Sequence, residues 1–196
     1  PCASQERAVR IGAAQTLINH VEHGKQINQW LADTAMSNVA VDIDLNALGT
    51  ANAFRVLQGA EIWAQHGDWL TNNSTTIASD IKVRFDWCAT ISQEDIAQAR
   101  QDQQTVIDYM ATLFTDVDVI VLPTTPGLSP LLSTEADQLA DYRNQLLSMT
   151  ALAGLCGLPQ LHLPLFTLNG APCGVSLLGP KGSDHTLISV ATRLLD

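Results

Sequence analysis

The residue types of a hydrolase active site are concentrated near the C-terminus of this sequence. The thirteen-residue stretch CGVSLLGPKGSDH contains Ser176, Lys181, Ser183, Asp184 and His185. Hydroxyl, amine, carboxylate and imidazole groups are the groups from which enzymes draw nucleophiles, bases and their orienting partners. Whether these residues perform such chemistry depends on their spacing and on the elements that carry them.

Ser176 does not have the setting of a nucleophile. The nucleophile elbow has the pattern G-x-S-x-G, because small residues on both sides let the strand turn sharply and expose the hydroxyl. Gly174 fits this pattern, but Leu178 stands where the second glycine is required. The residues alternate regularly through this stretch, so Ser176 is predicted to lie within a strand.

Ser183, Asp184 and His185 are consecutive in the sequence. Members of a catalytic triad approach one another across a fold rather than along three successive residues. Ser183 or Asp184 instead suits the N-cap of a helix, where a side-chain oxygen accepts a free backbone N–H. The stretch CGVSLLGPKGSDH is therefore interpreted as having a structural role, and no catalytic residue is assigned to this chain.

Two other polar pairs in the sequence have too few ligands to form a metal site. His20 and His23 have helical spacing, and Asp42 and Asp44 share a strand face, but no third ligand is evident beside either pair. We expect no metal and no cofactor. The four cysteines have no C-x-x-C spacing, which indicates thiols in a reducing, cytoplasmic compartment; they are Cys2, Cys88, Cys156 and Cys173.

Composition excludes two classes of partner. Hydrophobic residues make up 46% of the 196 residues, charged residues 15%, and the formal net charge is −10. Such a surface repels phosphate backbones, and no Lys/Arg cluster provides a basic stripe, so nucleic-acid binding is not expected. No apolar run approaches the roughly 18 residues of a membrane span. Residues 1–196 are expected to form a single α/β domain.

Hydrophobic periodicity predicts alternating strands and helices. Strands are expected at 8–14, 38–45, 117–123, 159–166 and 173–179, and helices at 23–36, 50–70, 92–114, 136–154 and 183–196. Gly67 and Asp68 predict a helix end, Ser92 and Asp95 a capping box, and Asn169-Gly170 a hairpin turn. The unbroken apolar run at 117–123 indicates a strand buried on both faces. The fold class is α/β, with a mixed sheet flanked by helices on both faces.

Several segments, taken in order, resemble the C-terminal half of the amidase signature family. They are DVDVIVLPTTPGLSPLL, YRNQLLSMTALAGLCGLPQLHLPL and NGAPCGVSLLGPKGSD, with RIG and FRVLQGAEIWAQHGDWL upstream. Each motif is weak alone, but their common order is specific and covers nearly the whole chain. The helix before GLP is most similar to that of small-amide hydrolases, including the indole-acetamide type.

The resemblance implies hydrolysis of carboxamides to acid and ammonia by a nucleophilic Ser, a second Ser in a cis peptide, and a base Lys. This sequence has no Gly-Gly-Ser-Ser segment and no Ser-Ser pair, and none of its lysines, Lys25, Lys82 and Lys181, precedes such a segment. We therefore expect the C-terminal portion of a longer amidase, inactive alone, whose partner is the missing N-terminal half that carries the triad.

The resemblance also implies which residues form a wall of the amide substrate pocket. They are Thr124, Thr125, Pro126, Ser148, Met149, Thr150 and Ala153. Turn chemistry at Thr124 to Pro126 and core packing at Met149 remain alternative interpretations. Two other functions also stay open: a stand-alone, non-catalytic binding or subunit module, and part of the glutaminase subunit of a tRNA-dependent amidotransferase. A homo-oligomer is left open.

Overall fold

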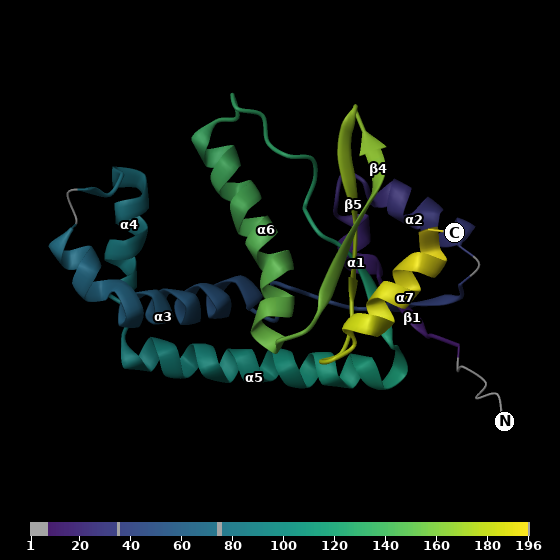
Figure 1. Cartoon of the computed structure of the whole chain (residues 1–196), viewed down its shortest axis with the longest axis horizontal. Helices are drawn as coiled ribbons and strands as arrows, with labels where there is room; N and C mark the ends of the chain where they lie inside the picture. Colours follow the sequence, from purple (N-terminus) through teal and green to yellow (C-terminus); the bar gives the residue numbers. More distant parts are fainter. Residues whose placement is uncertain (1–7, 35, 74–75, 196) are drawn as a thin grey trace.

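The computed structural model describes residues 8–34, 36–73 and 76–195. Helices and strands alternate along these residues (Figure 1). The strands are β1 Ile11–Ala14, β2 Asn38–Val41, β3 Val119–Pro123, β4 Gln160–Leu168 and β5 Ala171–Leu178. The helices are α1 Gln15–Asn19, α2 Gly24–Asp33, α3 Thr50–Asn72, α4 Ser79–Cys88, α5 Gln93–Asp116, α6 Ala136–Cys156 and α7 Asp184–Leu195.

The five described strands form one mixed sheet in the order β2-β1-β3-β5-β4. β1 pairs in parallel with both β2 and β3, whereas β5 is antiparallel to β3 and to β4. The sequence prediction of an α/β fold with a mixed sheet is confirmed. β3 lies at the centre of this sheet, and all five of its residues are buried. Because successive side chains point to opposite faces, both faces of the sheet are covered at β3.

A second apolar cluster lies where three long helices meet. α3 packs against both α5 and α6, and α4 packs on α3 at the far end from the sheet (Figure 1). Ala53 and Leu57 of α3, Ala99 of α5 and Leu155 of α6 form the buried centre of this cluster. Cys156 contacts both this cluster and the sheet core, and burial raises the pKa of its thiol to about 11.

None of the described helices combines the length and apolar character needed to cross a membrane.

Two local predictions are confirmed and one is wrong. Ser92 and Asp95 form the capping box of α5, and Asn169 and Gly170 take φ values of 52° and 82° in the turn between β4 and β5. α3, however, continues through Gly67 to Asn72. A Cβ at residue 67 would lie 3.0 Å from the Trp63 ring, so Gly67 permits close side-chain packing instead of ending the helix.

His23 ties the start of α2 to β5. Its side chain is fully buried, and Nε2 lies 3.0 Å from the carbonyl oxygen of Gly174. Because only a protonated nitrogen can donate to a carbonyl, the ring proton is on Nε2, and the buried Nδ1 has no hydrogen-bond partner among the described residues. Burial lowers the pKa of His23 and neighbouring His162 adds to this effect, whereas the hydrogen bond to Gly174 and the charge of Glu22 oppose it. The neutral ring is therefore the form that the folded protein accommodates.

The free energy of unfolding should fall as the pH drops below about 6.5, the ordinary pKa of histidine. In that range the unfolded chain takes up a proton on His23 that the folded chain takes up only at lower pH, so protonation favours unfolding. The His23→Gln variant keeps an N–H donor for Gly174 but does not titrate. Urea unfolding at about pH 7.5, 6.5 and 5.5 should therefore show a flatter pH dependence for this variant.

The other four histidines are the same in both proteins, so the difference between the two pH curves reports on His23. As a second comparison, His23→Ala leaves a cavity and an unpaired carbonyl, and should lose about 2–4 kcal/mol at neutral pH. Parallel curves for wild type and His23→Gln would contradict the assignment of a neutral, buried ring.

Candidate functional site

Four polar side chains meet where β3 ends, on the part of the sheet shared with β4 and β5. Thr124 Oγ1 lies 2.7 Å from Ser176 Oγ and 2.6 Å from His162 Nδ1. Gln160 Nε2 donates to Ser176 Oγ over 2.8 Å. Ser176 is fully buried, Thr124 and Gln160 are half-buried, and His162 is exposed. This group, the Thr124 cluster, therefore runs from the sheet core to the surface.

The strand register brings the cluster together. Ser176 of β5 stands opposite Leu122 of β3 on one side and opposite His162 of β4 on the other. Directly opposed residues in neighbouring strands share a face of the sheet, and so do residues two apart in one strand. Thr124, two residues beyond Leu122, consequently emerges on the same face as Ser176 and His162.

Hydrogen bonds to α6 and to the residues between α1 and α2 hold the loop after β3. The Thr125 hydroxyl donates to the carbonyl of Gly127 over 2.8 Å, and the Tyr142 hydroxyl reaches the same oxygen at 3.5 Å. Glu22 binds the loop twice: its backbone N–H donates to the Pro126 carbonyl, and its carboxylate accepts from the N–H of Leu128. The loop that follows Thr124 therefore has a defined position relative to the sheet.

A side chain at position 127 would displace the Glu22 carboxylate from this loop. A Cβ at position 127 would lie 2.5 Å from the Glu22 carboxylate oxygen, a distance that real Cβ contacts do not reach. Burial also raises the pKa of Tyr142, an effect to which the charge of Glu22 adds and which neighbouring Thr125 opposes. The tyrosine is therefore protonated at neutral pH and available as a donor to the loop.

The sequence-predicted pocket residues fall into two groups. Thr124, Thr125 and Pro126 lie together, half-buried, in and beside the Thr124 cluster. The α6 residues form no described hydrogen bond with the side chains of the Thr124 cluster. On α6, Met149 and Ala153 are buried in the sheet core.

The two hydroxyl residues of the α6 group are bonded within their own helix. Ser148 is half-buried, and its hydroxyl donates to the Asn144 carbonyl, while its own carbonyl accepts from Thr50. Thr150 is exposed and donates to the carbonyl of Leu146. Also on α6, Tyr142 is hydrogen-bonded to the loop after β3.

Gln160 and His162 are members of the cluster that the sequence analysis did not identify. Both are polar residues at alternate positions of a strand that otherwise reads as apolar, in QLHLPLF. That alternation places them on one face, which was a usable signal. Thr124 is separated by 52 residues from Ser176 and by 38 residues from His162, so the sequence does not name these partners.

The chemistry of the cluster is that of polar recognition. A hydroxyl beside an imidazole is the arrangement of a nucleophile and its base, and Thr124 with His162 has this geometry. Nucleophile–base pairs, however, usually have a third group that orients the base. Within the described stretches no side chain is hydrogen-bonded to His162 Nε2, and no three His, Cys, Asp or Glu side chains converge as metal ligands do.

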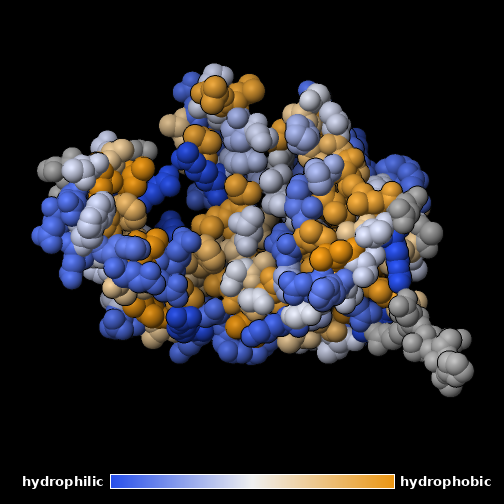
Figure 2. Space-filling view, in the orientation of Figure 1, coloured by the Kyte–Doolittle hydropathy of each residue, from blue (hydrophilic) through white to orange (hydrophobic). Residues whose placement is uncertain are grey.

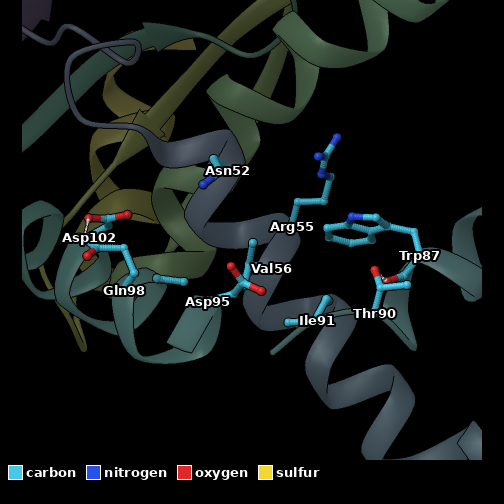
Figure 3. A pocket seen from close by; sticks show the side chains of 10 residues that line it. Asn52, Arg55, Val56, Trp87, Thr90, Ile91, Asp95, Gln98 and Asp102 are labelled. Carbon is cyan, nitrogen blue, oxygen red and sulfur yellow. Dashed lines mark hydrogen bonds between the residues drawn. The ribbon is translucent and has the colours of Figure 1, made fainter. Parts of the chain in front are cut away.

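A separate cavity of about 270 Å³ lies among α3, α4 and α5 (Figure 3). The Arg55 guanidinium is 4.7 Å from the centre of the Trp87 ring at one side of this cavity. Asp95 and Asp102 lie on the other side and are hydrogen-bonded to Ser92 and Gln98 respectively. The space-filling view also shows a hollow bordered by hydrophilic residues between α4 and α6 (Figure 2). None of the sequence-predicted pocket residues lines the cavity among α3, α4 and α5.

Comparisons with known proteins give a consistent result. Amidase 1 of Arabidopsis thaliana is 29% identical over 75% of this chain and 35% of its own length. One of the subunits of the glutamyl-tRNA(Gln) amidotransferase of Pseudomonas entomophila is 36% identical over 49% of this chain and 20% of its own length. A crystal structure of an amidase superposes with a TM-score of 0.85 at 18% identity, covering 95% of this chain and 45% of that one.

This chain thus spans about a third of amidase 1, and the structural likeness supports the fold alone. The family assignment comes from the sequence itself. The family model for amidases matches residues 16–188, which include the whole of the Thr124 cluster, most of α1 and the first turn of α7. The chain belongs to the amidase family.

Proposed function

We propose that this chain is the C-terminal part of an amidase-signature hydrolase that cleaves the C–N bond of carboxamides to acid and ammonia. The observation that carries the proposal is the family match over residues 16–188 in a sequence that lacks any Ser-Ser pair. The nucleophile, the cis-peptide serine and the base lysine would then come from a segment upstream of this chain. The free thiols of the described cysteines are consistent with a cytoplasmic location.

In this proposal the chain provides the scaffold and one wall of the substrate pocket. Thr124, Thr125 and Pro126 would face the acyl side of the amide, because the anchored loop presents them beside the exposed His162. The α6 residues of the wall, Ser148, Met149, Thr150 and Ala153, would contribute the helix surface behind it. Backbone N–H groups of the upstream half would stabilise the oxyanion.

The partner that completes the site would be the N-terminal half of the same protein. Among the described strands, β2 and β4 are the two edges of the sheet. β4 has nine residues and β2 has four, so β4 has the longer row of unpaired backbone groups. Leu131 and Leu132, in the loop before α6, are also exposed apolar side chains. We propose that the upstream half covers the β4 edge.

Two alternatives have different consequences. A stand-alone binding module would keep this half-fold without amide hydrolysis, and the glutaminase component of a tRNA-dependent amidotransferase would require a partner protein. The match to the Pseudomonas entomophila amidotransferase gives the second alternative its support. Ammonia release from free amides by the longer protein without a partner favours the small-amide hydrolase.

The 196-residue chain by itself should release no ammonia from simple or aromatic carboxamides above background. It should also self-associate in light scattering, because the β4 edge and the exposed leucines would be uncovered. Co-expression with the upstream coding sequence should restore both turnover and a single molecular mass. Turnover by the isolated chain would contradict this proposal and would indicate that Thr124 and His162 act as a nucleophile–base pair.

In the complete amidase, Thr125→Ala should lower kcat/KM by about tenfold, which corresponds to the loss of roughly one hydrogen bond. The hydroxyl of Thr125 fixes the Gly127 carbonyl, so its removal would loosen the loop that faces the acyl group. Thr112→Ala is the matched control, since the Thr112 hydroxyl also donates to a backbone carbonyl but lies exposed on α5. Equal losses in the two variants would contradict a specific role for the loop.

A further inference from the structure

The proton positions of the Thr124 cluster follow from its donors and acceptors. The Gln160 amide nitrogen can only donate, so Ser176 Oγ accepts from it. Ser176 is fully buried, and its own proton must therefore go to a protein acceptor. Within the described stretches the remaining hydrogen-bonded neighbour of Ser176 Oγ is Thr124 Oγ1, at 2.7 Å. Ser176 therefore donates to Thr124.

This hydrogen-bond order favours one tautomer of His162. Thr124 Oγ1 accepts from Ser176 in this arrangement, and we assign its own proton to the hydrogen bond with His162 Nδ1, which lies 2.6 Å away. Nδ1 is then the unprotonated ring nitrogen, and the ring proton lies on Nε2. The hydrogen bonds run in one direction: Gln160 to Ser176 to Thr124 to His162. They end on an N–H group that has no partner in the described part of the chain.

The position of this N–H group suits ligand recognition. His162 belongs to a regular strand and stands opposite the buried Ser176, so its backbone is held by the sheet rather than by a loop. Its side chain is exposed and is bonded to Thr124, the first residue of the proposed acyl wall. A donor held in place before binding loses little conformational freedom when a ligand accepts from it.

We propose that His162 is a specificity-determining residue whose Nε2–H donates to an oxygen on the acyl portion of the amide substrate. Gln160, Ser176 and Thr124 are positioning residues that hold the imidazole in this tautomer. The favoured substrates are carboxamides with a carboxylate or carbonyl oxygen in the acyl group, in preference to those with a hydrocarbon acyl group. This role rests on the proposed function, because it requires an amide in the pocket beside Thr124.

The relay is tested by the tautomer of His162 in the complete protein labelled with 15N-histidine. Two-bond 1H–15N spectra should show the ring proton on Nε2. Thr124→Val should convert this signal into a mixture of tautomers, whereas Thr124→Ser keeps the hydroxyl and should keep the signal. His185→Phe removes an exposed histidine of α7 and serves to assign the spectrum. A ring proton on Nδ1 in the wild type would overturn the relay.

The substrate role is tested with two amides of nearly equal shape, succinamate and 4-methylpentanamide. His162→Phe should reduce kcat/KM about tenfold for succinamate, mainly through KM, and change it little for 4-methylpentanamide. His162→Gln, which retains an N–H donor, should recover part of the loss. Unchanged melting temperatures would show that the variants fold.

The outcomes separate the two proposals. An equal effect of His162→Phe on both amides, or no effect on either, overturns the specificity role while amide hydrolysis stands. A complete wild-type protein that hydrolyses neither these nor other carboxamides refutes the proposed function, and the substrate role falls with it. The tautomer measurement does not depend on activity, so failure of the relay is distinguishable from failure of the function.

Discussion

The complete burial of β3 is the constraint on which the rest of the structure depends. All residues from Val119 to Pro123 are buried, with β1 parallel on one side and β5 antiparallel on the other. The first polar side chain after such a strand emerges at its end, and that residue is Thr124. Since β5 runs in the opposite direction, its residue Ser176 lies next to this exit. The position of the cluster thus follows from the way the central strand is enclosed.

Two buried polar residues of this region are tolerated because each has a partner. An unpaired hydroxyl inside the sheet would cost about 1–3 kcal/mol, and Thr124 with Gln160 removes that cost for Ser176. His23 is similarly bonded to the carbonyl of Gly174, two residues from Ser176 on the same strand. β5 is therefore fixed by polar contacts from the α1–α2 region and from β4. These contacts fix the register of β5 and also stabilise the fold, because a shift of β5 by one residue would break the hydrogen bonds of both Ser176 and Gly174.

The sequence predicted the strands and the longer helices because their patterns are local. Ser176 was correctly placed within a strand, and Asn169-Gly170 marked the hairpin that pairs β4 with β5. α4 had no such signal, since its residues lack a clear apolar stripe and its packing is on α3. Gly67 misled because the sequence does not distinguish a glycine that ends a helix from one that accommodates a tryptophan ring. The remaining difficulty was tertiary: no local pattern indicates that His162 and Thr124 share a hydrogen bond.

The cluster is held by two kinds of element, paired strands and an anchored loop, and under the proposed function this combination would suit discrimination between similar amides. His162 and Ser176 are on paired strands, whose geometry changes little, whereas Thr125 and Pro126 are on a loop held by Glu22 and Tyr142. In the proposed site a strand-borne donor would set a fixed distance to one substrate atom, and the anchored loop would present Thr125 and Pro126 at defined positions around it. A site that leaves its donor unpaired penalises a hydrocarbon ligand more than an apolar wall penalises a polar one. In the proposed amidase, selectivity for a polar acyl group would therefore come from the sheet, and the shape of the acyl wall from the loop.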